Sequence, residues 1–297
     1  MTTPANRELD RITVLLVTYQ SAHCASALGK SLEAFPNIIV IDNASSDNTL
    51  EAFAQRMPRA KVIANERNLG FGAANNRGAL AAETEFVLLL NPDCIIDTSA
   101  AQQLLQCADA NPCASMIAPQ LIDRHGNADK NYSMGHNTWP AKGPLADADT
   151  CVRFVSGACM LIRRDAMLKI KGFDERFFLY YEDTDLCLRL SEQCGEIILA
   201  PQSRVTHLSR GSSGGKARFN AEYLRGYHHI QSKFLFDLKH HQVSVSPFKR
   251  WRYCLVAGLE LCIRLLLLDA VRASRVLGRV VGAWRYPDDM KSRQVSF

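Results

Sequence analysis

Short runs of apolar, mostly β-branched residues alternate with helix-compatible stretches along the first hundred residues of the chain. Runs of this length and composition predict buried strands. The predicted strands are Ile12–Val17, Ile38–Ile41, Lys61–Ala64 and Phe86–Leu90. The helices predicted between them are Ser21–Ala34, Asn48–Arg56 and Phe71–Ala82. Continuous apolar strands separated by helices are typical of an α/β fold with a mostly parallel sheet covered on both faces.

The pattern changes after residue 123. Residues 123–150 are rich in Asn, Gly, Asp and Pro and lack periodicity, which predicts a long surface loop. Regular patterns then return as a strand, a helix, a second strand and a second helix, over Cys151–Arg163, Glu182–Ser191, Ile197–Ala200 and Arg218–Leu238. We expect one domain over residues 1–240 and a separate tail over residues 241–297.

The tail is apolar but interrupted. Glu260 and Arg264 lie in its most apolar part, so no run reaches the roughly 18–20 apolar residues that cross a bilayer. At about 100° per residue, the charged side chains fall on one side of a helix, namely Glu260, Arg264, Arg272, Arg275 and Arg279. The pattern predicts an amphipathic helix or helix pair. It either packs on the main domain or lies on anionic lipid, and both readings stay open.

Charge is distributed unevenly. Residues 1–200 contain 18 Lys and Arg against 24 Asp and Glu, a net charge of −6. Residues 201–297 contain 17 basic against 6 acidic side chains, a net charge of +11. A basic end suggests an anionic partner such as a membrane surface or a pyrophosphate. No basic and aromatic pattern of a nucleic-acid-binding module is present, so we expect no nucleic acid partner.

The ten cysteines show neither zinc-ligand spacing nor a disulfide framework. The first eleven residues are polar and lack the apolar core of a signal peptide. Both features favour a reducing cytoplasm.

Polar residues follow three of the predicted strands. Thr18 and Tyr19 end the first, Asp42 ends the second, and Asn91 and Asp93 follow the fourth. Ligands of parallel sheets bind at the carboxyl ends of the strands. We therefore expect Asp42 to accept a hydrogen bond from a base or ribose, and Asp93 to hold a divalent cation. Each segment also suits an ordinary turn or helix cap.

A glycine-rich segment, Asn68–Gly78, opens the third predicted helix. Small residues such as Gly70 allow the backbone to approach a ligand closely, and a helix N-terminus suits a phosphate. The segment lacks the Gly-Lys-Ser/Thr of a Walker loop, and it does not follow the first strand as a dinucleotide fingerprint would.

Acidic and aromatic residues adjoin in the segment Tyr180–Asp185. A carboxylate beside apolar walls has a raised pKa and suits a general base, although acids in a first helical turn also stabilise the helix dipole. His207 follows the strand Ile197–Ala200, and an imidazole together with a carboxylate makes a reasonable Mg²⁺ or Mn²⁺ site. Next to it, the loop Arg210–Lys216 is rich in hydrogen-bond donors.

Taken in order, these motifs resemble family 2 glycosyltransferases of the GT-A fold, in particular the rhamnosyltransferase-like branch. The resemblance covers residues 12–240. The segments that carry it are Val17–Tyr19, Asp42–Asp47, Asn68–Gly72, Leu90–Asp93, Ser156–Ala158, Gly172–Glu175, Phe178–Arg189 and His207. Each segment is common by itself, and the ordered set is specific.

The resemblance implies an inverting transfer from a nucleoside diphosphate sugar. Donor-binding residues would be Thr18, Tyr19, Asp42, Asn68, Gly70 and Asn91, with Arg210 and Ser212 closing over the pyrophosphate. Asp183 would be the general base, and Glu182 an acceptor-binding group or second base. Asp93 and His207 would hold Mg²⁺ or Mn²⁺. Asn91 departs from the family's Asp-x-Asp motif, where an Asp stands first, which weakens direct metal binding at that position.

The resemblance points to dTDP-L-rhamnose as donor, with UDP-linked sugars next. The basic tail fits a glycan or lipid-linked acceptor at the inner face of the membrane, in cell-surface polysaccharide synthesis. Two other classes remain open on the residues alone. A nucleotidyltransferase would need a basic glycine-rich loop after the first strand, and the sequence has Thr18–Ser21 there. A non-catalytic nucleotide-sugar-binding module would account for Asn91.

Overall fold

The computed structural model describes residues 8–135, 144–208 and 218–293. They form two compact units. The first contains residues 8–173 and 183–208, and the second contains residues 174–182 and 218–293. From the sequence, the first domain is predicted to end at residue 240. In the structure the helix α8 (Arg218–His241) already belongs to the second unit.

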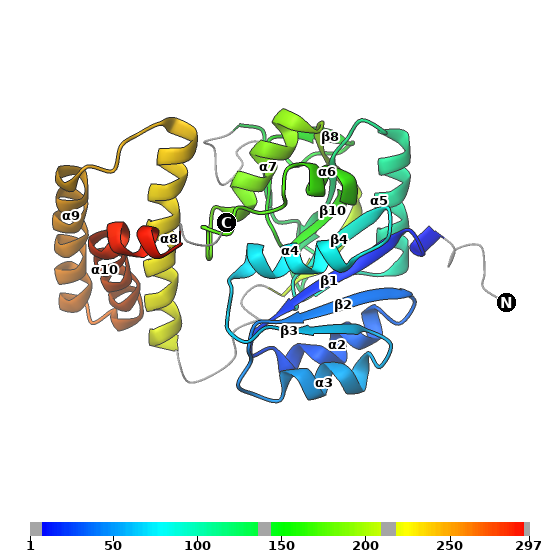
Figure 1. The fold of residues 1–297 in the computed structure, drawn as a ribbon, viewed down its shortest axis with the longest axis horizontal. Helices are drawn as coiled ribbons and strands as arrows, with labels where there is room; N and C mark the ends of the chain where they lie inside the picture. The colour runs from blue at the N-terminus through cyan, green and yellow to red at the C-terminus, as the bar shows by residue number, and fades with distance from the viewer. Residues whose placement is uncertain (1–7, 136–143, 209–217, 294–297) are drawn as a thin grey trace. The chain divides into compact units, whose positions relative to one another are not determined.

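A mixed sheet forms the centre of the first unit (Figure 1). The strand order is β3-β2-β1-β4-β10-β6-β11-β5, and β8 also pairs with β11. The bounds are β1 (Ile12–Thr18), β2 (Asn37–Asp42), β3 (Lys61–Ala64), β4 (Phe86–Leu90), β5 (Cys94–Ile95), β6 (Met116–Ile122), β8 (Thr150–Val152), β10 (Cys159–Arg163) and β11 (Ile197–His207). Strands β3, β2, β1 and β4 are parallel, as are β6 and β11, whereas β10 runs antiparallel between β4 and β6. A separate pair joins β7 (Tyr132–Ser133) to β9 (Phe154–Val155).

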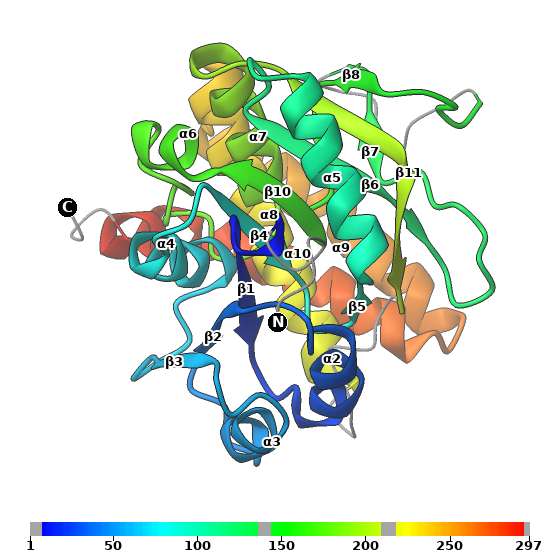
Figure 2. The ribbon, with the colours of Figure 1, turned by 90° about the vertical axis from the view of Figure 1, so that its right-hand side faces the viewer.

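Helices cover both faces of this sheet because successive strand residues point to opposite sides. Val14 and Leu88 belong to one apolar core, while their neighbours Leu15 and Leu89 belong to the other. The first core includes residues of α2 (Ala25–Ser31), α3 (Thr49–Arg56) and α5 (Thr98–Ala110), and a short 3₁₀ helix, η1 (Ala22–Cys24), precedes α2. The second core includes residues of α4 (Phe71–Ala81), α6 (Arg164–Lys169) and α7 (Glu182–Gln193). Figure 2 shows α5 along β6 and β11. The predicted fold class is confirmed.

Three predictions for the second half of this unit were wrong in detail. The strand expected over Cys151–Arg163 is three strands, β8, β9 and β10, with Ser156 and Gly157 between the last two. The predicted loop over residues 123–150 contains β7. Strand β11 continues to His207 instead of ending at Ala200, because an irregular register between Ala200 and Arg204 accommodates Pro201 without ending the pairing.

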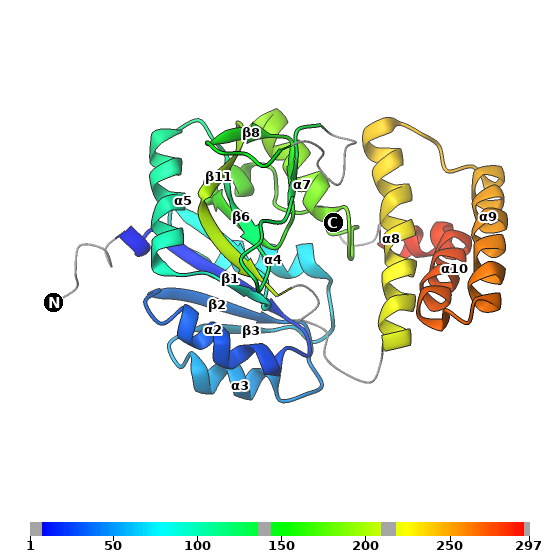
Figure 3. The ribbon, with the colours of Figure 1, turned by 180° about the vertical axis from the view of Figure 1, so that it is seen from behind.

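The second unit is helical (Figure 3). It contains α8, α9 (Pro247–Leu266) and α10 (Ala270–Arg293), and α10 packs against both others. The backbones of α8 and α10 approach closely at glycines. A Cβ on Gly226 would lie 2.0 Å from the carbonyl oxygen of Arg275, and one on Gly278 would lie 2.0 Å from that of Tyr223. Larger residues at these two positions would therefore force the helices apart.

The segment Asp174–Glu182 joins this helical unit. Asp174 pairs with Lys239 of α8 at 2.7 Å, and the Ser232 hydroxyl donates to the carbonyl of Leu179 at 2.9 Å. The ring of Phe178 stacks on His228. Among the described helices of both units, none combines the length and apolar character that crossing a membrane requires.

Candidate functional site

The carboxyl ends of β1 and β2 carry a network of buried polar side chains. The Asp42 carboxylate accepts hydrogen bonds from the Thr18 hydroxyl at 2.9 Å and from the Ser45 amide and hydroxyl at 2.8 and 2.6 Å. Thr18 and Asp42 are almost fully buried, whereas Tyr19 keeps 46% of its surface exposed. Asp42 therefore shapes the turn after β2, and Tyr19 is the predicted donor residue whose ring is available for a base to stack on.

Two asparagines that the sequence analysis did not select connect this turn to the start of α4. Asn43 donates to the carbonyl of Gly70 at 3.1 Å and accepts from the Asn65 amide at 2.8 Å. The Asn68 carbonyl oxygen accepts from the Gly70 amide at 2.9 Å, and Gly70 has a φ of 87°, which only glycine adopts readily. The predicted residues Asn68 and Gly70 thus form the N-terminus of α4. A signal for Asn43 and Asn65 was available, since both directly follow strands.

Asp93 and His207 are brought together by backbone pairing. Strand β5 pairs antiparallel with β11, which sets Cys94 opposite His207, and the Leu208 amide donates to the Asp93 carbonyl at 2.9 Å. The carboxylate oxygen Oδ1 of Asp93 lies 3.6 Å from Nε2 of His207. Two ligand atoms about 2.1 Å from one cation lie roughly 3–4 Å apart, so the pair fits a divalent ion.

A third side chain, Cys94, lies within reach of the same point. Burial raises the pKa of its thiol well above the ordinary value, and its Sγ donates to the Ala158 carbonyl at 3.4 Å. The predicted ligands, one carboxylate and one imidazole, suit Mg²⁺ or Mn²⁺ completed by phosphate oxygens.

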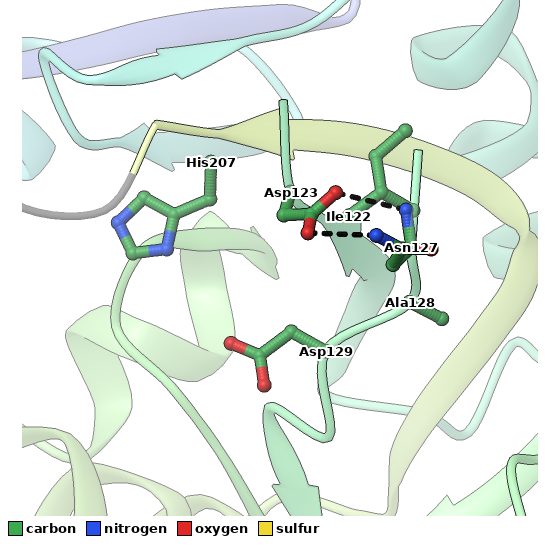
Figure 4. A pocket seen from close by; sticks show the side chains of 6 residues that line it. All are labelled: Ile122, Asp123, Asn127, Ala128, Asp129 and His207. Carbon is green, nitrogen blue, oxygen red and sulfur yellow. Dashed lines mark hydrogen bonds between the residues drawn. The ribbon is translucent and has the colours of Figure 1, made fainter. Parts of the chain in front are cut away.

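His207 also faces a pocket of about 180 Å³ whose wall includes Asp123 and Asp129 (Figure 4). The Asp123 carboxylate accepts from the backbone and side-chain amides of Asn127 at 2.9 and 3.0 Å, which closes a tight turn after β6. Asn127 lowers the pKa of Asp123, so this acid is ionised at neutral pH. Both acids fall in the segment predicted as a plain surface loop, and only the position of β6 next to β11 reveals their place.

Asp183 lies in the first turn of α7. Its carboxylate accepts from the Gly157 amide at 3.2 Å and from the Thr184 amide at 2.8 Å. Burial raises the pKa of Asp183 above the ordinary 3.8, and these hydrogen bonds offset part of that rise. Tyr180 and Tyr181, just ahead of it, have φ values of 69° and 64°, which are strained for residues with side chains.

Its neighbours in α7 have structural roles. Arg189 donates to Asp185 at 2.8 Å and to the carbonyls of Ile170 and Gly172 at 2.9 and 2.7 Å, so this pair holds the helix in place. Glu182 is buried and ends the segment that joins the helical unit. Arg210 and Ser212 lie outside the described residues.

One backbone segment connects the two halves of this site. The Gly157 amide donates to Asp183, and the next residue, Ala158, accepts from the Asn91 amide at 2.9 Å. Asn91 in turn accepts from the Cys94 amide at 2.9 Å, which closes the turn that carries Asp93. The predicted base Asp183 and the turn that carries Asp93 are therefore positioned from adjoining residues of the same segment.

Comparison with known proteins shows the family and the fold. The model of glycosyl transferase family 2 matches residues 13–170, and that of glycosyl transferase family group 2 matches residues 137–282. An N-acetylglucosaminyl-diphospho-decaprenol L-rhamnosyltransferase of Mycobacterium tuberculosis is 28% identical, over 90% of this chain and 96% of its own length.

Two solved structures share the fold. The Staphylococcus aureus TarS 1-349 in complex with UDP has a TM-score of 0.53 at 15% identity, covering 94% of this chain and 91% of that one. The mannosyltransferase PcManGT of Pyrobaculum calidifontis with GDP-Man and Mn²⁺ has a TM-score of 0.55 at 14% identity, covering 97% and 79%. With one family model spanning more than half of the sequence, this chain belongs to glycosyl transferase family 2 and is a glycosyltransferase of the GT-A fold.

Proposed function

We propose that the protein is an inverting glycosyltransferase that moves L-rhamnose from dTDP-L-rhamnose to a hydroxyl of a glycan or lipid-linked acceptor in cell-surface polysaccharide synthesis. The sugar is inferred from the mycobacterial relative, whose name gives an L-rhamnosyl transfer to a diphospho-decaprenol lipid. UDP-linked sugars are the second choice for the donor. The two structural neighbours were solved with UDP and with GDP-Man, which favours a nucleoside diphosphate sugar as the class of donor.

The observation that carries the proposal is that one segment supports both Asp183 and the turn that carries Asp93. Transfer requires a base next to the acceptor hydroxyl and charge compensation next to the departing diphosphate. The Gly157–Ala158 segment holds the elements that provide both. A Cβ on Gly157 would lie 3.4 Å from the Cβ of Asp183 and 3.4 Å from the Phe71 ring, so Gly157 lies directly beside Asp183.

Asp183 acts as the general base. Its carboxylate takes the proton from the acceptor hydroxyl, and the oxygen then attacks the anomeric carbon on the face opposite the diphosphate. The burial that raises the pKa of Asp183 makes it a stronger base than an exposed aspartate. Glu182 is proposed as an acceptor-binding group.

Asp93 and His207 are proposed as the metal ligands, and Mg²⁺ or Mn²⁺ would stabilise the negative charge of the diphosphate leaving group. Asn91 orients the turn that carries Asp93 through its backbone bonds to Ala158 and Cys94. The amide of Asn91 faces the donor as a neutral group.

The donor nucleotide is assigned to the edge formed by β1, β2 and the start of α4. The Tyr19 ring stacks on the base, and Asp42, positioned by Thr18 and Ser45, uses its remaining lone pair for a base or ribose group. Asn68 and Gly70 place the α4 N-terminus beside the donor. Arg210 and Ser212 are assigned to the pyrophosphate.

We place the reaction in the cytoplasm, at the inner face of the plasma membrane. A lipid-linked acceptor would be presented there, and the basic tail, residues 241–297, would associate with the membrane.

The test is a thermal-shift panel of dTDP, dTDP-L-rhamnose, UDP, UDP-linked sugars and GDP, each with and without Mn²⁺ or Mg²⁺. A ligand at one hundred times its Kd stabilises the protein by about 2.7 kcal/mol, so a site shows as a clear rise in melting temperature. We expect the largest rise with dTDP-L-rhamnose plus metal. We also expect Asp93→Ala and His207→Ala to remove the metal-dependent part of it.

Asp129→Ala is the matched control, because Asp129 faces the same pocket as His207 but is not assigned to the metal. A folded protein that responds to no nucleotide contradicts the proposal. A rise with UDP alone keeps the glycosyltransferase and overturns dTDP-L-rhamnose as donor. A metal response that survives in both ligand variants overturns the metal assignment.

A further inference from the structure

In helix α9 ion pairs lie on the inner side and apolar residues on the exposed side. A helix on the surface of a water-soluble protein has the opposite arrangement. The ion-paired side chains of α9, Glu260 and Arg264, lie on the side that faces α10. Glu260 pairs with Arg279 of α10 at 3.0 Å and with Arg264 at 3.7 Å. Cys254, on the same side, donates from Sγ to the Val280 carbonyl at 3.7 Å, and Ala257 is buried there.

The opposite side of α9 is apolar and exposed. We call it the outer face, and it consists of Phe248, Trp251, Leu255, Val256, Leu259, Ile263 and Leu266. Their exposed fractions range from 50% for Leu255 to 83% for Leu266. At about 100° per residue the seven side chains fall within an arc of about 140°, so they form one continuous stripe. The turn that follows adds Leu267 and Leu268, the latter 90% exposed.

Exposed aromatic residues lie at one end of the stripe and favour a lipid surface as its partner. The Arg250 guanidinium donates to the Trp284 carbonyl at 3.3 Å, so the end of α10 that carries the exposed Trp284 lies beside the first turns of α9. Trp251 and Phe248 are exposed at the same end, and such aromatic clusters are typical of the boundary between lipid headgroups and acyl chains.

The net positive charge of this region also favours an anionic lipid surface. Residues 241–286 contain eight basic and two acidic side chains, a net charge of +6. The acids are Glu260 and Asp269, and both are paired with arginines. Two exposed arginines, Arg252 and Arg285, lie near the outer face, and Arg252 falls within its arc, where its long side chain can extend to the headgroups.

We propose that the outer face of α9 binds the surface of an anionic lipid bilayer, with the helix lying in the headgroup region and its leucines and aromatic residues inserted among the acyl chains. Interfacial helices typically have an apolar face, flanking basic residues and interfacial aromatic residues, and α9 has all three. This inference deepens the proposed function, because it names the surface that holds the enzyme next to a lipid-linked acceptor. Its test needs neither donor nor acceptor, so the membrane proposal and the proposed glycosyltransferase function can fail separately.

The test is co-sedimentation of the full chain with vesicles of phosphatidylglycerol and phosphatidylcholine in equal parts, and with vesicles of phosphatidylcholine alone. We expect binding to the mixed vesicles that weakens as salt is raised, and weaker binding to the neutral ones. The double variant Leu259→Glu, Ile263→Glu should reduce binding by about a hundredfold, roughly tenfold for each side chain withdrawn from lipid. Arg252→Gln and Arg285→Gln should each reduce it by about fivefold.

Leu80→Glu is the matched control. Leu80 is 69% exposed on α4 of the first unit, so the same change there should leave vesicle binding intact. Because the altered side chains are exposed, melting curves should show that all variants fold. Absence of binding by the unaltered chain overturns the proposal, as does equal binding by the double variant. A stable dimer in sedimentation velocity that Leu259→Glu dissociates would overturn it in favour of an interface between two copies.

Discussion

In the sheet-based unit, leucines such as Leu15 and Leu88 are fully buried, and polar side chains gather at the carboxyl edge of the strands. In the helical unit, Leu259 and Ile263 are more than half exposed, while Glu260 and Arg279 pair on the inner side of α9. The first arrangement is that of a domain in water with one ligand-binding edge. The second suits a surface next to lipid. Under the proposals made above, recognition of the donor and attachment to the membrane reside in different units.

The largest expected effect is the loss of transfer activity in a variant that still binds vesicles. Asp183→Asn removes the base and should lower the rate of transfer by about 10²–10⁴-fold, because general base catalysis contributes that much. Transfer of the radiolabelled sugar to an acceptor measures it. Vesicle co-sedimentation of this variant should equal that of the unaltered chain. Undiminished transfer in a folded Asp183→Asn protein would remove the base assignment. The matching variant Glu182→Gln would then show whether the neighbouring acid is the base.

A second prediction concerns the packing of the helical unit. In Gly278→Ala, the new Cβ would clash with the Tyr223 carbonyl at 2.0 Å, so we expect a loss of about 1–3 kcal/mol in the free energy of unfolding of this unit. Urea unfolding followed by circular dichroism measures the change. Nucleotide binding should be unaffected if the donor site lies in the other unit.

The control for that prediction is Gly258→Ala in α9. A Cβ on Gly258 meets nothing within 4 Å, so alanine should stabilise the helix by about 0.5–1 kcal/mol through its higher helix propensity. Equal effects of the two substitutions would mean that α8 and α10 do not pack closely at Gly278.

The smallest effect is the dependence of stability on pH at Asp183. Burial raises the pKa of Asp183 in the folded chain above 3.8, so folding favours its protonated form. The stabilisation from protonated Asp183 is fully present below the unfolded pKa and is lost as pH rises through the raised folded pKa. The melting temperature of the unaltered chain should therefore rise relative to that of Asp183→Asn as pH falls from neutrality.

The same raised pKa predicts the acidic limb of the activity profile. Transfer requires ionised Asp183, so the rate should decline with falling pH at values above those typical of an exposed aspartate. A melting-temperature difference that does not vary with pH would contradict the burial of this carboxylate.

Much of the first unit could be predicted because its strands are continuous apolar runs. Lys61–Ala64 and Phe86–Leu90 have the predicted bounds, and, as expected, Asp42 ends β2 and both Asn91 and Asp93 follow β4. The region after Asp93 was harder. The sequence analysis identified neither α5 nor β6, and Pro201 concealed the second half of β11, which carries His207.

Other features depended on contacts between residues distant in sequence. Thr18 and Asp42 are 24 positions apart, and their hydrogen bond exists only because β1 and β2 are neighbours. Asp123 and Asp129 reach the pocket beside His207 because β6 pairs with β11. For the tail, periodicity placed Glu260, Arg264 and Arg279 on one side of a helix, but the turn after Leu266 makes two helices that face each other.

The sequence by itself determined the α/β class, the family motifs, the charge asymmetry and the amphipathic character of the tail, because these depend on local order and composition. The tertiary structure alone decided which polar groups meet at the site and which side of α9 is covered. Periodicity defines two sides of a helix, but only the partner helix decides which side is buried. In α9 the side with Glu260 and the buried Ala257 meets α10, where Glu260 pairs with Arg279, and the apolar side is exposed.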